Sequence, residues 1–160
     1  MKPEIGITTK DLKKSVDLLS TILADEMTLY VKTRKFHWNV SGESFMELHK
    51  LFQSQYTELE EVIDEVAERI NKLGSKTIGT MKEFAAITRL KESPDLCILH
   101  RKKDMIAELL NNHQSVIIEL RKDIDICTES NHDAGTTDFL TGIMQQHETI
   151  AWILRRYLGQ

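Results

Sequence analysis

The stretch FMELHKLFQSQYTELEEVIDEVAERINKLG, residues 45–74, carries the clearest structural signal in this sequence. Its apolar residues and one histidine recur at alternating intervals of four and three residues, which keeps them on one side of an α-helix. This stripe consists of Phe45, His49, Phe52, Tyr56, Leu59, Ile63, Val66, Ile70 and Leu73, and Gly74 follows it as a helix-ending residue. The pattern predicts one long helix over about residues 43–73.

Similar apolar stripes occur on both sides of this helix in the sequence. The first runs from Leu12 to Tyr30 with helical spacing. Further along the chain, Ser93-Pro94 has the form of an N-cap followed by proline at the first helical position. These signals predict further helices at about residues 9–37, 94–127 and 136–158, and a short amphipathic helix at about residues 80–87.

The lengths of the connections predict how these helices are arranged. About six residues join the first two long helices and about eight join the last two, so each pair should be antiparallel neighbours. The middle connection has about twenty residues, enough to run the length of a bundle. The order short, long, short predicts an all-α, ferritin-like four-helix bundle with one crossover, formed by residues 1–160 as a single domain.

The composition is that of a globular protein. The 160 residues are 41% hydrophobic and 29% charged, and the net charge of −4 argues against a broad basic surface for nucleic acid. There is neither an apolar run of the roughly 18–20 residues that a membrane span needs nor a secretory signal. Cys97 and Cys127 should lie about 45 Å apart on one helix, too far for a disulfide between them. We therefore expect a cytoplasmic protein without a membrane segment.

Polar side chains that can bind a metal ion interrupt the stripe of the 43–73 helix. His49 and Gln53 form a pair separated by one turn, and Asp64 and Glu68 form a second such pair. His37 lies shortly before this helix. Imidazole nitrogens combined with carboxylate oxygens suit iron, zinc or manganese.

One helix cannot bring these two pairs to the same ion. His49 and Asp64 are 15 residues apart, about 22 Å along the helix axis, whereas metal–ligand bonds are about 2 Å long. Two copies packed antiparallel about a two-fold axis near Leu59 would bring the histidine pair of one chain to the acidic pair of the other. A site that uses both pairs would therefore have to lie between subunits.

Each of these residues also has a simpler interpretation. A single histidine on an apolar stripe is more often a hydrogen-bonded core residue than a metal ligand, and His113 and His147 are interpreted in that way. The acidic pair alone is typical of a solvated helix face, and Trp38 alone would be a core residue. The spacing of Glu129 and His132 occurs at a helix end, which disfavours a ferritin-type di-iron motif within one chain.

Longer stretches resemble the Dps family, the mini-ferritins named for DNA protection during starvation. These are FHWNVSGESFMELHKLFQSQY from Phe36, DEVAERINKLG ending at Gly74, and the tail DAGTTDFLTGIMQQHETIAWILRRYLG. Together with the four-helix layout, the resemblance covers nearly the whole chain. It implies a hollow dodecamer, built from two-fold dimers, that oxidises ferrous iron with hydrogen peroxide in preference to oxygen. The ferric product is stored inside as a mineral, which protects the cell from oxidative stress.

The resemblance also implies roles for individual residues. The catalytic metal ligands would be His37 and His49 of one chain and Asp64 and Glu68 of its partner, at a two-fold interface. Trp38 corresponds to the family's tryptophan beside the site, which would take up stray oxidising equivalents.

Three further positions concern the pores and a departure from the family. Asp133 and Asp138 correspond to acidic residues that line the family's iron-uptake pores. The family usually has Asp or Glu one turn after the second histidine, where this chain has Gln53. A neutral amide can donate an oxygen, but the site loses one negative charge, so iron should bind less tightly.

Three functions remain open from the sequence. The first is a ferroxidase that also stores iron. The second is a DNA-compacting protein, which is disfavoured because a cage of chains that each carry −4 repels DNA phosphate. The third is a non-catalytic metal buffer, motivated by Gln53, in which zinc occupies a site of histidines and carboxylates.

Overall fold

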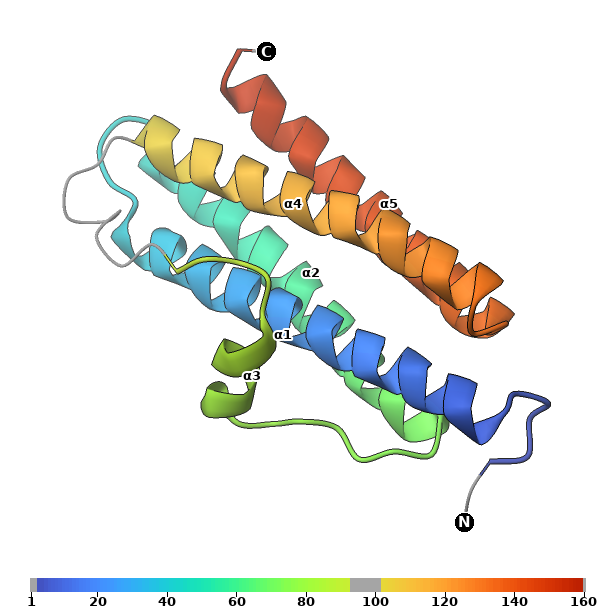
Figure 1. The fold of residues 1–160 in the computed structure, drawn as a ribbon. Helices are drawn as coiled ribbons and strands as arrows, with labels where there is room; N and C mark the ends of the chain where they lie inside the picture. The colour runs from blue at the N-terminus through green and yellow to red at the C-terminus, as the bar shows by residue number, and fades with distance from the viewer. Residues whose placement is uncertain (1–2, 93–101, 160) are drawn as a thin grey trace.

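The computed structural model describes residues 3–92 and 102–159, and every regular element within these ranges is a helix. The elements are α1 (Thr9–Asn39), α2 (Phe45–Lys72), α3 (Met81–Ile87), α4 (Lys102–Glu129) and α5 (Ala134–Tyr157). In Figure 1, α1 and α2 form one antiparallel pair, α4 and α5 form another, and α3 lies against the outside of α1. The predicted all-α bundle with a long crossover is confirmed.

The predicted helix limits agree with the structure to within two residues where it describes them. α1 begins where the Thr8 hydroxyl accepts a hydrogen bond from the backbone N–H of Asp11, so Thr8 is the N-cap. α5 begins at Ala134, two residues before the predicted start, because the carboxylate of Asp133 caps it. The predicted start at Ser93-Pro94 and the position of Cys97 lie outside the described residues.

The core uses only one side of the broad apolar face of α2. The buried residues of α2 are Leu48, Phe52, Gln55, Leu59, Val62, Val66 and Ile70. Leu73, which follows the helix, is also buried. Phe45 is 38% exposed, and Tyr56 and Ile63 are only partly buried. The predicted stripe is confirmed in part: Phe52, Leu59, Val66, Ile70 and Leu73 are core residues, whereas Phe45, His49, Tyr56 and Ile63 lie at the border of the buried face. One side of α2 keeps apolar and aromatic groups at the surface of the single chain.

The crossover is fixed to the bundle by a capped helix and an ion-pair cluster. Thr80 and Glu83 form a capping box at the start of α3, and Phe84 is buried. After α3, Arg89 donates from its backbone N–H and its Nε to the two oxygens of Asp25 on α1, at 2.6 and 2.7 Å. Its Nη1 also donates to Asp123 on α4 at 2.9 Å. Arg89 therefore joins α1, the crossover and α4.

Two further predictions concern the cysteines and the membrane. Cys127 is buried and free, and burial raises the pKa of its thiol to about 11. None of the helices in the described part of the chain is both long enough and apolar enough to cross a membrane.

Candidate metal-binding site

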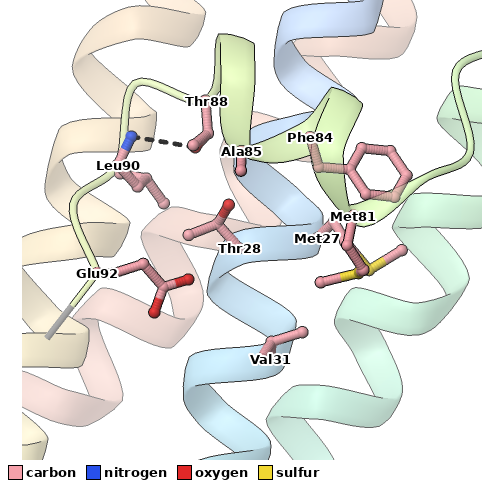
Figure 2. Close-up of a pocket in the computed structure, with 9 residues that line it drawn as sticks. All are labelled: Met27, Thr28, Val31, Met81, Phe84, Ala85, Thr88, Leu90 and Glu92. Carbon is pink, nitrogen blue, oxygen red and sulfur yellow. Dashed lines mark hydrogen bonds between the residues drawn. The ribbon is translucent and has the colours of Figure 1, made fainter. Parts of the chain in front are cut away.

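The pocket shown in Figure 2 lies between α1 and α3 and has a volume of about 180 Å³. Most of its lining is apolar, including Met27, Met81 and Phe84, and Glu92 is the only ionisable side chain among the residues that line it. A single carboxylate cannot form an acid–base pair or a metal site of the usual three or four ligands. The candidate site has to be sought elsewhere, where the predicted ligands lie.

The turn between α1 and α2 brings His37 and His49 together. His37 is in the last turn of α1 and His49 is near the start of α2, so the antiparallel pair places them opposite each other. Their rings are stacked, with centroids 3.7 Å apart and an interplanar angle of 20°. His37 is buried and His49 is partly buried. We call these two residues the histidine half-site.

A reciprocal pair of hydrogen bonds orients both rings. His37 Nδ1 lies 2.8 Å from the backbone oxygen of His49, and His49 Nδ1 lies 3.0 Å from the backbone oxygen of His37. Because a carbonyl oxygen only accepts, each Nδ1 carries the hydrogen. Each neutral ring then keeps an unprotonated Nε2, which is the form in which histidine binds metals. The fold thus holds both rings in an orientation in which Nε2 is not used by these backbone hydrogen bonds.

The other predicted ligands lie on the exposed surface of α2. Gln53, Asp64 and Glu68 are all exposed, and Glu68 accepts a hydrogen bond from Lys72 Nζ at 3.0 Å. Asp64 lines a shallow groove of about 560 Å³ whose walls come entirely from α2. We call Asp64 and Glu68 the acidic half-site.

The two half-sites do not meet within one chain. Among residues 3–92 and 102–159, no three His, Cys, Asp or Glu side chains lie together so as to hold a metal ion. This agrees with the axial separation of about 22 Å expected from the helical rise. The histidine half-site, on α1 and α2, and the acidic half-site, on α2, are therefore separate features of the single chain.

The two predicted pore residues have different environments. Asp133 is 1% exposed, caps α5, and receives a hydrogen bond from Arg69 Nη2 at 3.1 Å. Its carboxylate is thus occupied by structural bonds, which argues against the predicted pore role. Asp138 is exposed and lines a pocket of about 320 Å³ with His132 at the turn between α4 and α5. Of these two residues, Asp138 is the one that is accessible at the surface of the single chain.

The core histidines have the hydrogen bonds that the sequence predicted, but with a partner it did not identify. His113 and His147 lie with their Nδ1 atoms 2.9 Å apart, and His147 Nε2 lies 2.9 Å from Glu26 Oε1. All three side chains are buried. Glu26 could have been found from the sequence, because it is a charged residue within the apolar face of α1.

A cluster of aromatic rings around Arg34 was also missed. The guanidinium carbon of Arg34 lies 5.4 Å from the ring centre of Tyr30, 5.5 Å from that of Trp38 and 4.6 Å from that of Tyr56. Trp38 is 65% exposed, so it is not the core residue of the simpler interpretation. The spacing of four residues between Tyr30, Arg34 and Trp38 could have indicated the part of the cluster on α1.

Comparison with known proteins shows that this chain is similar to members of one family. The ferritin-like domain family matches residues 16–160. An uncharacterised low temperature-induced protein of Nostoc is 40% identical over 96% of this chain and 85% of its own length. DNA protection during starvation protein 2 of Bacillus anthracis is 35% identical over 92% of this chain and 99% of its own length.

A solved structure supports the same relationship. The Dps protein of Vibrio cholerae O1, described as a member of a broad superfamily of ferritin-like diiron-carboxylate proteins, superposes with a TM-score of 0.90. It is 27% identical, and the match covers 98% of this chain and 96% of that one.

Proposed function

The chain belongs to the Dps family of ferritin-like proteins, and from this premise we propose that it is a mini-ferritin that binds and oxidises ferrous iron. Hydrogen peroxide is the preferred oxidant, oxygen is the slower one, and the ferric product is stored as a mineral inside a dodecameric cage. Removing peroxide and ferrous iron together protects the cell from oxidative damage.

The orientation of the histidine half-site is the observation that carries this proposal. Both Nδ1 atoms are held by backbone carbonyls, so both Nε2 atoms are left as ligands. Two neutral nitrogens alone leave the charge of a divalent cation unbalanced. The acidic half-site of a second subunit supplies the carboxylates that complete the site.

The surface of α2 supports a subunit contact at this place. Its side with Phe45, Tyr56 and Ile63 is only partly covered by the single chain, although these residues are apolar or aromatic. A second subunit related by a two-fold axis near Leu59 would cover this side. It would bring opposite half-sites together twice, which gives two equivalent sites per dimer.

The reaction needs two electrons for each peroxide. Two ferrous ions provide one electron each, the O–O bond breaks, and the two oxygens leave as water or hydroxide, which then hydrolyses the ferric product. The protein's contribution is to hold iron with open coordination positions between the two half-sites. Trp38, next to His37 and exposed, is the residue placed to take up stray oxidising equivalents.

Gln53 weakens the site without removing it. Its amide oxygen can bind a cation, but it carries no charge to balance one. We expect slower filling of a second iron position than with a carboxylate there. Asp138 belongs to the path by which iron reaches the interior, because acidic side chains concentrate cations near a pore.

A mixing experiment tests the shared site directly. One variant, His37→Gln with His49→Gln, lacks the histidine half-site, and another, Asp64→Asn with Glu68→Gln, lacks the acidic half-site. Each alone should lose fast iron oxidation by peroxide. Unfolded together and refolded, they should recover about a quarter of wild-type activity, since half of randomly formed dimers are mixed and each of these has one intact site. No recovery on mixing contradicts a site between subunits.

Two other functions give different results in simple measurements. DNA compaction predicts tight binding in a gel-shift titration that weakens steeply with salt, which the net charge of −4 disfavours. A zinc or iron buffer predicts stoichiometric metal uptake with no peroxide-dependent turnover.

A further inference from the structure

The two histidines of the half-site are each in contact with a further aromatic ring. The ring of Tyr56 lies edge-to-face with that of His37, at 5.2 Å between centroids and an interplanar angle of 80°. Phe45 lies 5.0 Å from the ring of His49 at 34°. An edge-to-face contact such as that between Tyr56 and His37 is favourable and sensitive to ring orientation. Tyr56 therefore limits how the His37 ring can turn.

Tyr56 is itself held by a cation. The guanidinium of Arg34 lies over its ring at 4.6 Å, the shortest of the three ring contacts that Arg34 makes. Arg34 also donates a hydrogen bond to the hydroxyl of Tyr30, and the Tyr30 ring lies edge-on to Tyr56 at 6.2 Å and 89°. Arg34 and Tyr30 are one turn apart on α1, whereas Tyr56 is on α2. The cluster thus joins the two helices that carry the histidines.

A direct role of Arg34 in metal binding is excluded by its chemistry. A guanidinium has no lone pair to donate and stays protonated, so it repels a nearby cation. Its Nε is buried and has no hydrogen-bond partner in the described structure. The attraction between its charge and the aromatic faces accounts for this placement. Arg34 can therefore influence the site only through the rings that it contacts.

Building on the proposed function, we propose that Tyr56 is a positioning residue for His37 and that Arg34 keeps Tyr56 in place. The Nδ1–H bond to the backbone fixes one point of the imidazole ring, and the Tyr56 contact restrains rotation about that point. Together they keep His37 Nε2 aimed at the ion. Without Tyr56, His37 remains present but is less well oriented, and metal affinity falls.

Cobalt(II) binding provides the first test, since cobalt reports its ligands through its absorption spectrum. We expect Tyr56→Leu to weaken cobalt binding by about 10-fold or more, the usual effect of losing a group that orients a ligand. Tyr56→Phe, which retains the ring, should bind within about twofold of wild type. Arg34→Met should weaken binding in the same direction as Tyr56→Leu.

A matched control separates positioning from general loss of stability. Leu120→Ala removes a buried side chain from α4, a helix that carries none of the proposed ligands. It should lower the midpoint of urea unfolding but keep the cobalt affinity. If Leu120→Ala and Tyr56→Leu weaken cobalt binding equally, Tyr56 has only a structural role and the proposal is wrong.

Nitrogen NMR of metal-free protein labelled at histidine gives a readout that does not depend on metal. In wild type, nitrogen relaxation should show that the His37 ring is as rigid as the backbone, and Tyr56→Leu or Arg34→Met should increase the motion of this ring. His37→Gln identifies the signals. Unchanged ring mobility in both variants would overturn the positioning role. Failure of His49→Gln to alter cobalt binding would instead refute the proposed metal site, while the mobility comparison would still decide the role of Tyr56.

Discussion

His113 and His147 face each other through their Nδ1 atoms at 2.9 Å in the interior of the bundle. This contact requires one ring to donate and the other to accept. His147 Nε2 lies 2.9 Å from Glu26 Oε1, so α1, α5 and α4 are joined by one buried chain of ionisable groups. Burial, followed by the influence of His147, lowers the pKa of His113 well below its usual 6.5.

The first prediction follows from this pKa. His113 in the unfolded chain binds a proton as the pH falls through about 6.5, whereas His113 in the fold stays neutral to a much lower pH. Its contribution to stability is therefore complete above pH 6.5 and is lost below it, by up to about 1.4 kcal/mol per pH unit. Urea unfolding at fixed protein concentration from pH 8 to pH 5 should show this slope. His113→Gln should reduce the slope, and the exposed His132→Gln should not; equal slopes in all three proteins would refute the assignment.

The second prediction concerns Gln53. Because the candidate site has one carboxylate fewer than is usual in the family, Gln53→Glu should restore that charge and tighten cobalt(II) binding by about tenfold, since affinity for a cation rises with the charge of its ligands. Iron oxidation by peroxide should become faster at low iron concentration. Gln146→Glu adds the same charge at an exposed position of α5 and should have no such effect. A similar gain in both variants would mean that overall charge, rather than ligation, is responsible.

The third prediction is that Arg89 stabilises the crossover. Asp25 is 1% exposed and receives two hydrogen bonds from Arg89, so Arg89→Met leaves a buried carboxylate without its cation. We expect a loss of about 3 kcal/mol in the free energy of unfolding. The control, Lys122→Met, removes an exposed ion pair with Glu119 and should cost less than about 1 kcal/mol. Comparable losses in urea unfolding would show that Arg89 is not a special contact.

The fourth prediction separates the two aspartates for which the resemblance to the Dps family implies a pore role. Asp133→Ala removes the cap of α5 and leaves Arg69 without its carboxylate partner, so it should lower stability by about 1–3 kcal/mol. Asp138→Asn should leave stability unchanged but slow iron uptake into the mineral, because it removes an exposed charge. Thermal unfolding and the rate of mineral formation measure the two effects. Asp133→Asn keeps the cap of α5 and provides the contrary test. If this variant took up iron slowly while Asp138→Asn took it up normally, Asp133 rather than Asp138 would be the pore residue.

The regularity of helices made one constraint on the candidate site predictable. The rise per residue alone showed that His49 and Asp64 cannot reach one ion within a chain, and the structure agrees in the residues that it describes. The roles of these ligands remain predictions that the mixing experiment tests. Trp38 illustrates the limit of such reasoning, since one residue type is compatible with a core position or with the exposed position observed.

The sequence by itself determined the helices, their order and the crossover, because local spacing, capping residues and connection lengths act over a few turns of one chain. Only the tertiary structure decided which side of α2 enters the core, that Asp133 is buried against Arg69, and that His37 and His49 orient each other through their backbone carbonyls. Those features depend on contacts between residues on different helices. The energies of such contacts are set by how the helices rotate and pack together, which a periodic pattern along one helix does not specify.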